Sequence, residues 1–405
     1  MTDEPTIHLR RDPLRAVDGP ADADDPDGVA GEPELVARIR AEIASGGPIS
    51  VARFMERALY EPGLGYYRRS APGPGRAGDF LTAPETHPVF GATLGRVAEA
   101  VWGRLGRPDP FAVLEIGAGT GALAVGLLDG LRRARSPLLA AIRYVAQDIE
   151  PARVVAARER LDAAGLGDHV EPPGTATKPS LVIANEVLDA LPVHRVVRRG
   201  SELRERLVDV TDDGFVEIDG PPARPELVDR LEHEGVRLAD GQLAEICLDI
   251  DAWVRATTIG LDRGVLVVID YGAEAADLYR PTRPEGTLRG FHRHRLVDDP
   301  YRRVGRQDLT AHVDLTALRE AARRAGLQPM GTTTQARLLA ALAGDLVAER
   351  LHDPATDLRA ALELRSALAR LLDPRGMGGF AVVAFGRGAG TDPLPGFDPL
   401  DGGTG

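Results

Sequence analysis

The sequence predicts an α/β fold built on a doubly wound parallel sheet, and three observations support this fold class. First, four continuous apolar runs suit strands buried on both faces: Phe111–Ile116, Ile142–Gln147, Ser180–Asn185 and Gly264–Asp270. Second, helical segments alternate with these runs, which favours parallel strands covered by helices. Third, a glycine-rich turn joins the first run to the helix-forming segment Ala122–Leu131.

Weaker signals complete the expected sheet. His169–Glu171 is a candidate for the third strand. Gln328–Thr334 and Phe380–Phe385 are expected to form a closing antiparallel pair. The two parts of the sheet domain therefore cover residues 106–192 and 262–387.

The segment before the first strand, residues 34–105, is expected to form a helical cap and lid. Helical periodicity covers Glu34–Ser45, Ile49–Met55 and Thr93–Leu105, and Ser50 can cap the second of these helices. Because this segment precedes the first core strand, we expect an addition to the sheet domain rather than a separate domain.

An insertion at residues 193–261 separates the fourth strand from the fifth. The sequence predicts a small β-meander and then two helices, at Val193–Val197, Leu203–Val210 and Gly214–Ile218, and at Leu227–Leu238 and Leu243–Ile259. Ligands of α/β sheets bind at the carboxyl ends of the strands, which is the edge that this insertion leaves from. We therefore expect the insertion to shape a substrate cleft.

Both ends of the chain differ in composition from the rest. Residues 1–33 are rich in Asp, Pro, Gly and Ala, and residues 388–405 are rich in Gly and Pro. Such segments cannot bury enough apolar surface to offset the entropy lost on ordering. The sequence therefore predicts a disordered N-terminal segment and a flexible C-terminal tail.

The composition fits a globular enzyme and argues against several other classes of protein. The net charge of -12 argues against nonspecific binding to nucleic acids or anionic membranes. The single cysteine, Cys247, excludes an intramolecular disulfide and a cysteine-rich metal cage, and we expect it to be a buried thiol in a helix. No apolar run is long enough to span a bilayer, and the first residues lack the features of an import signal. We therefore expect a cytoplasmic protein without membrane insertion.

The glycine-rich turn carries the most informative motif. Glu115 lies near the end of the first strand, and Gly117, Gly119 and Gly121 follow at alternate positions. This spacing differs from the dinucleotide fingerprint, and a carboxylate here suits a cationic or amine-bearing ligand better than a pyrophosphate. The pattern resembles motif I of class I S-adenosylmethionine (SAM) methyltransferases, whose cofactor carries an ammonium and a sulfonium. The alternative is a glycine-rich turn that binds no ligand.

Asp148 is the second candidate cofactor residue, because it directly follows the second strand. A carboxylate at this place can accept hydrogen bonds from both hydroxyls of an adenosine ribose. The alternative is that Asp148 caps the helix that begins near Pro151.

Polar residues at the exit of the fourth strand should point into the mouth of the cleft. Asn185 and Glu186 could hold the methionine portion of the cofactor or the acceptor nucleophile. Glu186 and Asp189 could share one face of a nascent helical turn, and two carboxylates suit a cationic acceptor such as an arginine guanidinium. The alternative role of these residues is capping and loop hydrogen bonding. Asp270 and Tyr271, after the fifth strand, follow the same logic with a weaker signal.

The histidines do not indicate a metal site. His292, His294 and His312 lack metal-ligand spacing on any evident helix. Asp314 is most simply the N-cap of the helix that follows it.

Several motifs together resemble the MidA family of SAM-dependent methyltransferases. They occur in the family's order, and they include Gly65-Tyr66-Tyr67, Gly78–Glu85, Glu115–Gly121, Asn185–Val193, Ile269–Gly272, Gly286–Arg289 and Asp308–Asp314. The resemblance implies a Rossmann-like class I methyltransferase fold with SAM as cofactor. That family includes a mitochondrial complex I assembly factor that dimethylates an arginine of a complex I subunit.

The resemblance also assigns a role to the segment Gly78–Glu85. It places this segment beside the cofactor as a mobile lid, which implies that Gly78, Asp79, Phe80 and Thr82 bind the cofactor.

Three functions follow from these observations. The leading hypothesis is a SAM-dependent methyltransferase that acts on an arginine nitrogen of a protein substrate, with Glu186 or Asp189 orienting the guanidinium and supporting proton loss. The second is a small-molecule methyltransferase of secondary metabolism. The third is an assembly or binding factor that keeps the SAM fold without turnover, which the intact Glu115 and Asp148 argue against. The sequence leaves open the acceptor, the number of methyl groups and whether the protein forms a homodimer.

Overall fold

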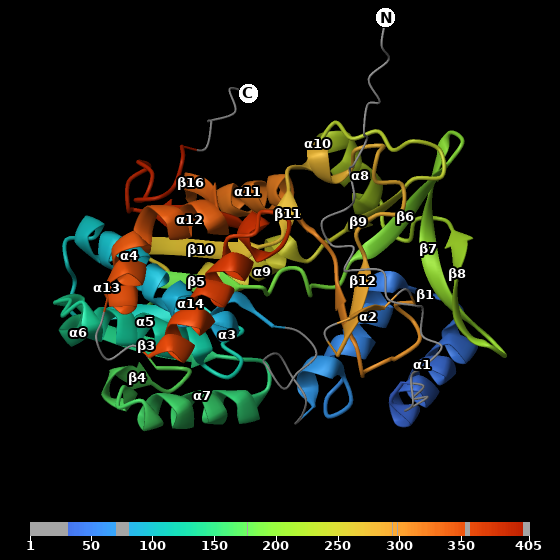
Figure 1. The fold of residues 1–405 in the computed structure, drawn as a ribbon. Helices are drawn as coiled ribbons and strands as arrows, with labels where there is room; N and C mark the ends of the chain where they lie inside the picture. The colour runs from blue at the N-terminus through green and yellow to red at the C-terminus, as the bar shows by residue number, and fades with distance from the viewer. Residues whose placement is uncertain are drawn as a thin grey trace, which may run out of the picture.

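The centre of the computed structural model is a seven-stranded sheet with the order β16-β17-β10-β5-β2-β3-β4 (Figure 1). Neighbouring strands are parallel, except that β17 is antiparallel to both β10 and β16. The strands are β2 (Phe111–Ile116), β3 (Ile142–Gln147), β4 (Val170–Glu171), β5 (Leu181–Asn185), β10 (Gly264–Asp270), β16 (Gln328–Thr334) and β17 (Ala381–Arg387). The structure describes residues 31–69, 81–175, 177–293, 295–297, 299–352 and 357–399.

This sheet confirms the predicted α/β fold and its strands. Side chains of β10 alternate between the two faces, because Val265 and Val267 join one hydrophobic cluster and Leu266 and Val268 join another. Every residue of β10 is buried, since helices cover both faces. This double burial explains why the apolar run is continuous rather than alternating.

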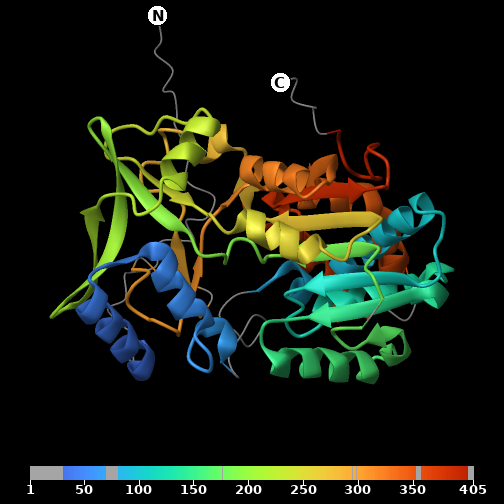
Figure 2. The ribbon, with the colours of Figure 1, turned by 180° about the vertical axis from the view of Figure 1, so that it is seen from behind.

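Helices cover both faces of the sheet (Figures 1 and 2). One face carries α4 (Val89–Arg104), α5 (Ala122–Arg133), α12 (Gln335–Leu342) and α14 (Leu358–Leu371), and the other carries α9 (Ile250–Thr258) and α11 (Leu315–Arg324). A Cβ on Gly91 of α4 would lie 2.8 Å from the Cα of Gly126 in α5, so the two helices cross at a contact that only glycine allows. Further helices are α3 (Ala83–Thr86), α6 (Leu138–Ala141), α7 (Pro151–Ala163), α8 (Glu226–His233), α10 (Ala275–Leu278) and α13 (Gly344–His352).

The N-terminal segment and the insertion together form a second lobe beside the sheet, on the right in Figure 1. Leu35 of α1 (Pro33–Gly46) and Phe54 of α2 (Val51–Tyr60) share a hydrophobic cluster with Val208 of the insertion. Of the predicted helical cap, α1 and α2 thus pack against the insertion, whereas α4 covers a face of the main sheet. The sheet of this lobe follows the order β1-β7-β6-β9, with β8 on β7, and its strands are β1 (Ile49–Ser50), β6 (His194–Arg199), β7 (Glu202–Thr211), β8 (Gly214–Gly220) and β9 (Leu243–Ile246).

Residues between β10 and α11 complete this lobe. They form a sheet of β13 (Arg295–Val297), β12 (Arg289–His292) and β14 (Asp308–Thr310), and a two-stranded pair of β11 (Gly272–Ala273) and β15 (Val313–Asp314). Leu309 of β14 joins the same cluster as Leu35. The lobe is thus assembled from three segments of the chain that lie far apart in the sequence.

Two helix caps occur where the sequence predicts them. The Ser50 hydroxyl accepts a hydrogen bond from the backbone N–H of Arg53, at 3.1 Å. The Asp314 carboxylate accepts one from the backbone N–H of Ala317, at 3.0 Å. Each cap satisfies a donor that the first helical turn leaves without a partner.

The predicted helix at Leu243–Ile259 is wrong. Its first residues form β9, which pairs with β6, and only Ile250–Thr258 is helical. An available strand edge outweighs local helical preference here. Cys247 therefore lies in the connection between β9 and α9 and not in a helix, although burial raises the pKa of its thiol to about 12.

The flexible tail predicted from residue 388 is also wrong for the residues that the structure describes. Leu394 and Phe397 are buried in the main hydrophobic cluster, and the Asp398 N–H donates to the Thr332 carbonyl at 2.8 Å. Glu32, predicted to be disordered, donates its N–H to the Val304 carbonyl at 2.7 Å. The remaining residues of the two predicted terminal segments, 1–30 and 400–405, lie outside the described residues.

A pair of buried carboxyl groups lies between α8 of the second lobe and the start of α11, which covers the sheet. Glu234 follows α8, and its side chain is 0% exposed. In the part of the chain that the structure describes, no N–H group donates to either carboxylate oxygen of Glu234. Its neighbour is the Asp314 carboxyl group, so a proton held between the two groups satisfies both. Burial, with the charge of Asp314, raises the pKa of Glu234 to about 8.

This pair predicts a pH dependence of stability. Folded Glu234 holds a proton that the unfolded chain releases above about pH 4.5, so its contribution to the free energy of unfolding should fall as the pH rises from about 4.5 to about 8. Glu234→Gln keeps a donor toward Asp314 but does not titrate, and should flatten this part of the curve. Urea unfolding at several pH values measures the effect, with the exposed Glu232→Gln as control. Equal slopes for wild type and Glu234→Gln would contradict the shared proton.

Candidate functional site

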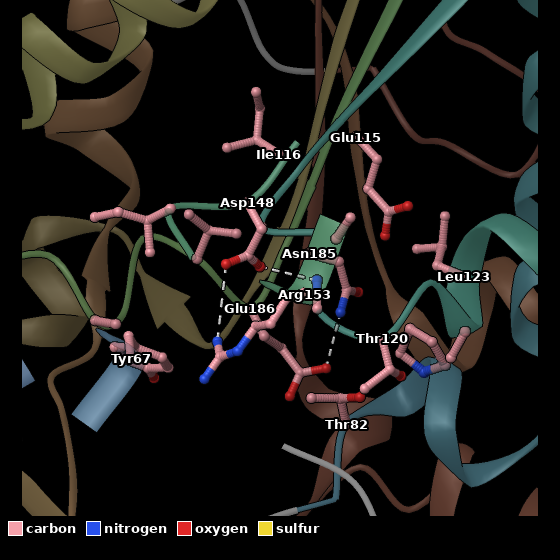
Figure 3. A pocket seen from close by; sticks show the side chains of 18 of the residues that line it. Tyr67, Thr82, Glu115, Ile116, Thr120, Leu123, Asp148, Arg153, Asn185 and Glu186 are labelled. Atoms are coloured by element: carbon pink, nitrogen blue, oxygen red, sulfur yellow. Dashed lines mark hydrogen bonds and ion pairs between the residues drawn. The ribbon is translucent and has the colours of Figure 1, made fainter. Parts of the chain in front are cut away.

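A cavity of about 350 Å³ opens at the carboxyl ends of β2, β3 and β5 (Figure 3). Polar groups from the strand exits meet there, together with apolar and aromatic side chains of α2, α9 and the turn after β5. The lining residues are Tyr60, Tyr67, Thr82, Pro84, Glu85, Glu115, Ile116, Gly117, Ala118, Gly119, Thr120, Ala122, Leu123, Asp148, Ile149, Arg153, Asn185, Glu186, Val187, Ala190, Leu191 and Trp253. Convergent polar groups in a largely apolar cavity are typical of a small-molecule site.

The glycine-rich turn forms one wall of this cavity. Gly117, Gly119 and Gly121 have φ angles of 71°, 52° and 77°, which lie in the left-handed region that favours glycine. A Cβ on Gly117 would lie 2.8 Å from Cγ2 of Val187. These glycines therefore allow a backbone turn and a close approach that other residues would block.

Glu115 brings a buried carboxylate to the cavity from β2. It is 4% exposed, and the Tyr144 hydroxyl donates to its Oε2 atom at 2.8 Å. Burial raises the pKa of Glu115 to about 8, with a smaller contribution from the charge of Asp148. A cation bound nearby would reverse this effect, because it would stabilise the ionised form.

Asp148 lies where the sequence predicts the ribose-binding carboxylate. Its Oδ2 atom accepts from the Gly119 N–H at 3.0 Å, and its Oδ1 atom accepts from the Glu150 N–H at 3.0 Å. The alternative role as N-cap of α7 is wrong, because Glu150 occupies that position. A carboxylate has about four lone-pair sites, so Asp148 retains acceptor capacity toward the cavity.

Asn185 ends β5 and lines the cavity, and its side-chain carbonyl oxygen is buried. Its Nδ2 atom donates to Oε1 of Glu186 at 2.9 Å, while its Oδ1 atom has no hydrogen-bond partner among the described residues. Leaving a buried acceptor without a donor costs about 1–3 kcal/mol. A donor supplied by a ligand, such as an ammonium group, would remove that cost.

Glu186 lines the cavity directly after β5 (Figure 3). Its φ angle of 54° is left-handed, which is rare for a residue other than glycine. Its Oε1 atom accepts from the Ala83 N–H at 3.1 Å as well as from Asn185. Burial raises the pKa of Glu186 to about 7, and the charge of Asp189 adds to this effect.

Asp189 does not line the cavity in the structure. Residues 186–190 form a turn without a helix, so the predicted shared helical face of Glu186 and Asp189 is wrong. Asp189 is 4% exposed, and its carboxylate accepts a hydrogen bond from the Tyr271 hydroxyl. Burial raises the pKa of Asp189 to about 6. The charge of Asp189 thus acts on Glu186 although Asp189 is not part of the cavity lining.

Asp270 also differs from the prediction that it points into the cleft. It is 1% exposed and is absent from the cavity lining. Its carboxylate accepts hydrogen bonds from the turn that follows β5 instead.

The predicted lid is only partly described. Gly78, Asp79 and Phe80 lie outside the described residues. Thr82 lines the cavity, and Glu85 of α3 accepts from Arg160 at 2.9 Å. The part of the lid that the structure describes is therefore held against α7.

Four aromatic or basic residues of the lining were not predicted from the sequence. Tyr60 and Tyr67 stack with ring centroids 5.7 Å apart, and the Arg153 guanidinium lies 5.7 Å from the centroid of the Tyr67 ring. Trp253 enters from α9 in the insertion. Tyr67 belongs to a motif that the sequence offers, but only the fold of the second lobe shows that it reaches the cavity.

His292 and His312 do not line the cavity. His292 bonds to the Arg306 carbonyl at 2.9 Å, His312 packs edge-on against Tyr271, and His294 lies outside the described residues. Within the described ranges, no group of three or more acidic, histidine or cysteine side chains could hold a metal ion. No helix there is both long and apolar enough to cross a membrane.

Comparison with known proteins identifies relatives over most of the chain. A family model of S-adenosyl-L-methionine-dependent methyltransferases matches residues 93–333. The chain is 30% identical to the Drosophila melanogaster homolog of the mitochondrial protein arginine methyltransferase NDUFAF7, over 86% of this chain and 84% of that protein. It is 26% identical to human NDUFAF7, over 85% of this chain and 81% of that protein.

A solved structure is similar over nearly the whole chain. A crystal structure of a protein from Burkholderia thailandensis, bound to S-adenosyl-homocysteine, has 38% sequence identity and a TM-score of 0.81. The match covers 94% of this chain and 97% of that one. The product of methyl transfer from SAM is therefore a ligand of a close structural relative.

The glycine turn yields a test of SAM binding. Gly119→Val forces a β-branched residue into φ 52° beside Asp148, and we expect SAM affinity to fall by more than about tenfold. Gly200→Val is a matched control, because Gly200 has φ 59° in a turn where an added Cβ would meet no atom of the described residues within 4 Å. Calorimetry with SAM compares the two. Equal affinities in both variants would remove the turn from the binding site.

Proposed function

The chain belongs to the MidA family of S-adenosyl-L-methionine-dependent methyltransferases, and we propose that it methylates an arginine nitrogen of a protein substrate. The observation that carries this proposal is the Glu186 carboxylate in the cavity, at the exit of β5. Tyr60 and Tyr67 of the second lobe give the same cavity an aromatic wall. A carboxylate beside aromatic rings suits a guanidinium, because a guanidinium can donate hydrogen bonds to the carboxylate and stack on the rings.

The residues present fit SAM, which supplies an electrophilic methyl group when it is bound. We assign the ribose hydroxyls to Asp148 and the ammonium group to the Asn185 carbonyl oxygen, which lacks a donor among the described residues. Glu115 also lines the cavity, and a bound cation would favour its ionised form. The glycines at 117, 119 and 121 keep the wall free of side chains where the ligand approaches.

Glu186 supplies the groups that an arginine acceptor requires. Its Oε1 atom is held by Ala83 and Asn185, and its Oε2 atom has no hydrogen-bond partner among the described residues. The Oε2 atom can therefore accept an N–H of the guanidinium and orient a nitrogen toward the methyl donor. The pKa of Glu186, about 7, suits a base that takes a proton from the nitrogen as the methyl group transfers. Asp189 supports it as the second negative charge.

The protein places a guanidinium of its own, that of Arg153, in the lining of this cavity, which supports a guanidinium as the acceptor. Arg153 lies over the Tyr67 ring, and its Nη1 atom is 3.9 Å from Oδ1 of Asp148. The names of the fly and human relatives, protein arginine methyltransferases, support the same acceptor. The cytoplasmic location and the homodimer remain predictions, and those relatives are named as mitochondrial.

The acceptor can be identified by transfer of a labelled methyl group. The protein is incubated with SAM that carries a deuterated methyl group and with a lysate of cells that lack this gene. Mass spectrometry of the digested proteins should then find the label on arginine. Label confined to small molecules would favour the methyltransferase of secondary metabolism, and no label in either fraction would favour a binding factor without turnover.

Glu186→Gln tests the role of the carboxylate. The amide oxygen can still accept from Ala83 and Asn185, so the fold and SAM affinity should change little. Methyl transfer to arginine should fall by roughly two to three orders of magnitude, the scale expected on losing one charge-stabilising group. The measurement pairs initial rates of label transfer with calorimetry of SAM binding. A wild-type rate in Glu186→Gln would remove Glu186 from the mechanism.

The pKa of Glu186 also predicts a pH profile. The carboxylate is the active form, so the rate at saturating SAM should rise with pH and level off at or below about 7, because the bound sulfonium favours the ionised form. Saturating SAM separates this effect from Glu115, whose protonation should act on SAM affinity. The rising limb should be absent in Glu186→Gln. A wild-type rate that is constant from well below to well above this pKa would contradict the assignment.

A further inference from the structure

We infer that Asp270 is a positioning residue for methyl transfer, because its carboxylate holds the turn after β5 in the conformation that points Glu186 into the cavity. The inference rests on the proposed function of Glu186 and adds a residue that the cavity lining does not include.

The backbone at Glu186 needs such support. Its φ angle of 54° lies in the left-handed region, which is unfavourable for a residue with a Cβ. A strained conformation persists only where its surroundings determine it. The Glu186 N–H donates to the Ile269 carbonyl of β10 at 2.8 Å, so the next strand in the sheet fixes the first residue of the turn.

Asp270 fixes the following three residues. Its Oδ2 atom accepts from the backbone N–H groups of Val187, Leu188 and Asp189, at 3.1, 2.9 and 3.2 Å. Consecutive N–H groups that converge on one oxygen form an anion-binding concavity, and here the anion is a side chain of the neighbouring strand. The turn can leave this conformation only by giving up these hydrogen bonds.

The other oxygen of Asp270 is also engaged. Its Oδ1 atom accepts from the backbone N–H of Tyr271 at 2.9 Å. Both oxygens thus accept backbone hydrogen bonds in a residue that is 1% exposed. An asparagine could accept with its oxygen, but its amide group would place a donor against a backbone donor. The site is therefore built for a carboxylate.

Electrostatics separate Asp270 from the groups that act on Glu186 directly. The pKa of Glu186 is raised by burial and by the charge of Asp189, and it is lowered by the Ala83 N–H and the Asn185 amide that donate to it. Burial raises the pKa of Asp270, and the charges of Asp189 and Glu186 add to this effect. Asp270 therefore acts on Glu186 through the backbone of the turn.

The kinetic constants distinguish a positioning role from a purely structural one. A residue that only stabilises the fold would lower the melting temperature without changing kcat per folded molecule. Asp270→Asn should instead lower kcat for label transfer by about a hundredfold, the scale of a small misplacement of a reacting group. SAM affinity should stay close to that of wild type.

Hydrogen exchange tests the geometry without an acceptor. In wild type the amides of residues 187–189 should be protected, and in Asp270→Asn they should exchange at least about tenfold faster than in wild type. Glu205→Gln is the matched control, because Glu205 is a 0% exposed carboxylate that accepts the Ala223 N–H at 2.7 Å on a strand of the second lobe. That control should leave the exchange of residues 187–189 and kcat unchanged.

Asp270→Glu serves if Asp270→Asn does not fold. It keeps the carboxylate but adds a methylene, so kcat should fall while SAM affinity stays close to that of wild type. Unchanged exchange at residues 187–189, or an unchanged kcat in Asp270→Asn, would overturn the inference. Failure of the proposed function appears separately, as a wild-type rate in Glu186→Gln, because the exchange measurement does not depend on the acceptor.

Discussion

The site depends on a constraint of parallel sheets, namely that neighbouring strands end at the same edge. Because β3, β2, β5 and β10 are adjacent and parallel, residues from distant parts of the sequence meet within one cavity. The strands can stay largely apolar, since the polar groups that reach the cavity lie near or directly after a strand end. Glu115, Asp148 and Asn185 reach the cavity in this way, and Glu186 follows Asn185.

The same constraint concentrates negative charge. Glu115 and Glu186 line the cavity, Asp189 and Asp270 lie behind them, and burial raises the pKa of each. Keeping several carboxylates close together out of water is unfavourable unless cations or N–H donors compensate. A sulfonium, an ammonium and a guanidinium are all cations. Binding of these cations would therefore reduce the unfavourable free energy of burying the carboxylates together. A neutral acceptor would not contribute to this reduction.

Much of this arrangement could be predicted from the sequence, because continuous apolar runs locate doubly buried strands and the next polar residue marks the exit. Two predictions were wrong because they depend on contacts between distant parts of the chain. The Leu243–Ile246 strand depends on a free edge of β6, which no local pattern reveals. The sequence predicts that Asp270 faces the cleft, but its carboxylate accepts hydrogen bonds from backbone N–H groups of residues that follow β5. Only the assembled sheet shows which of these N–H groups lack other partners.

The aromatic wall shows how the second lobe can act on the reaction. Tyr60 and Tyr67 come from the lobe, and their hydroxyls donate to the Ala190 carbonyl at 2.8 Å and to Asp308 at 2.7 Å. The lobe is therefore attached to the turn that follows Glu186 as well as to its own strands. The residues that we propose for the ribose and the ammonium group, Asp148 and Asn185, come from the sheet domain instead. Substitutions in the lobe could thus change which acceptor fits beside Glu186 without changing the glycine turn or Asp148. One cofactor site could in this way serve different acceptors.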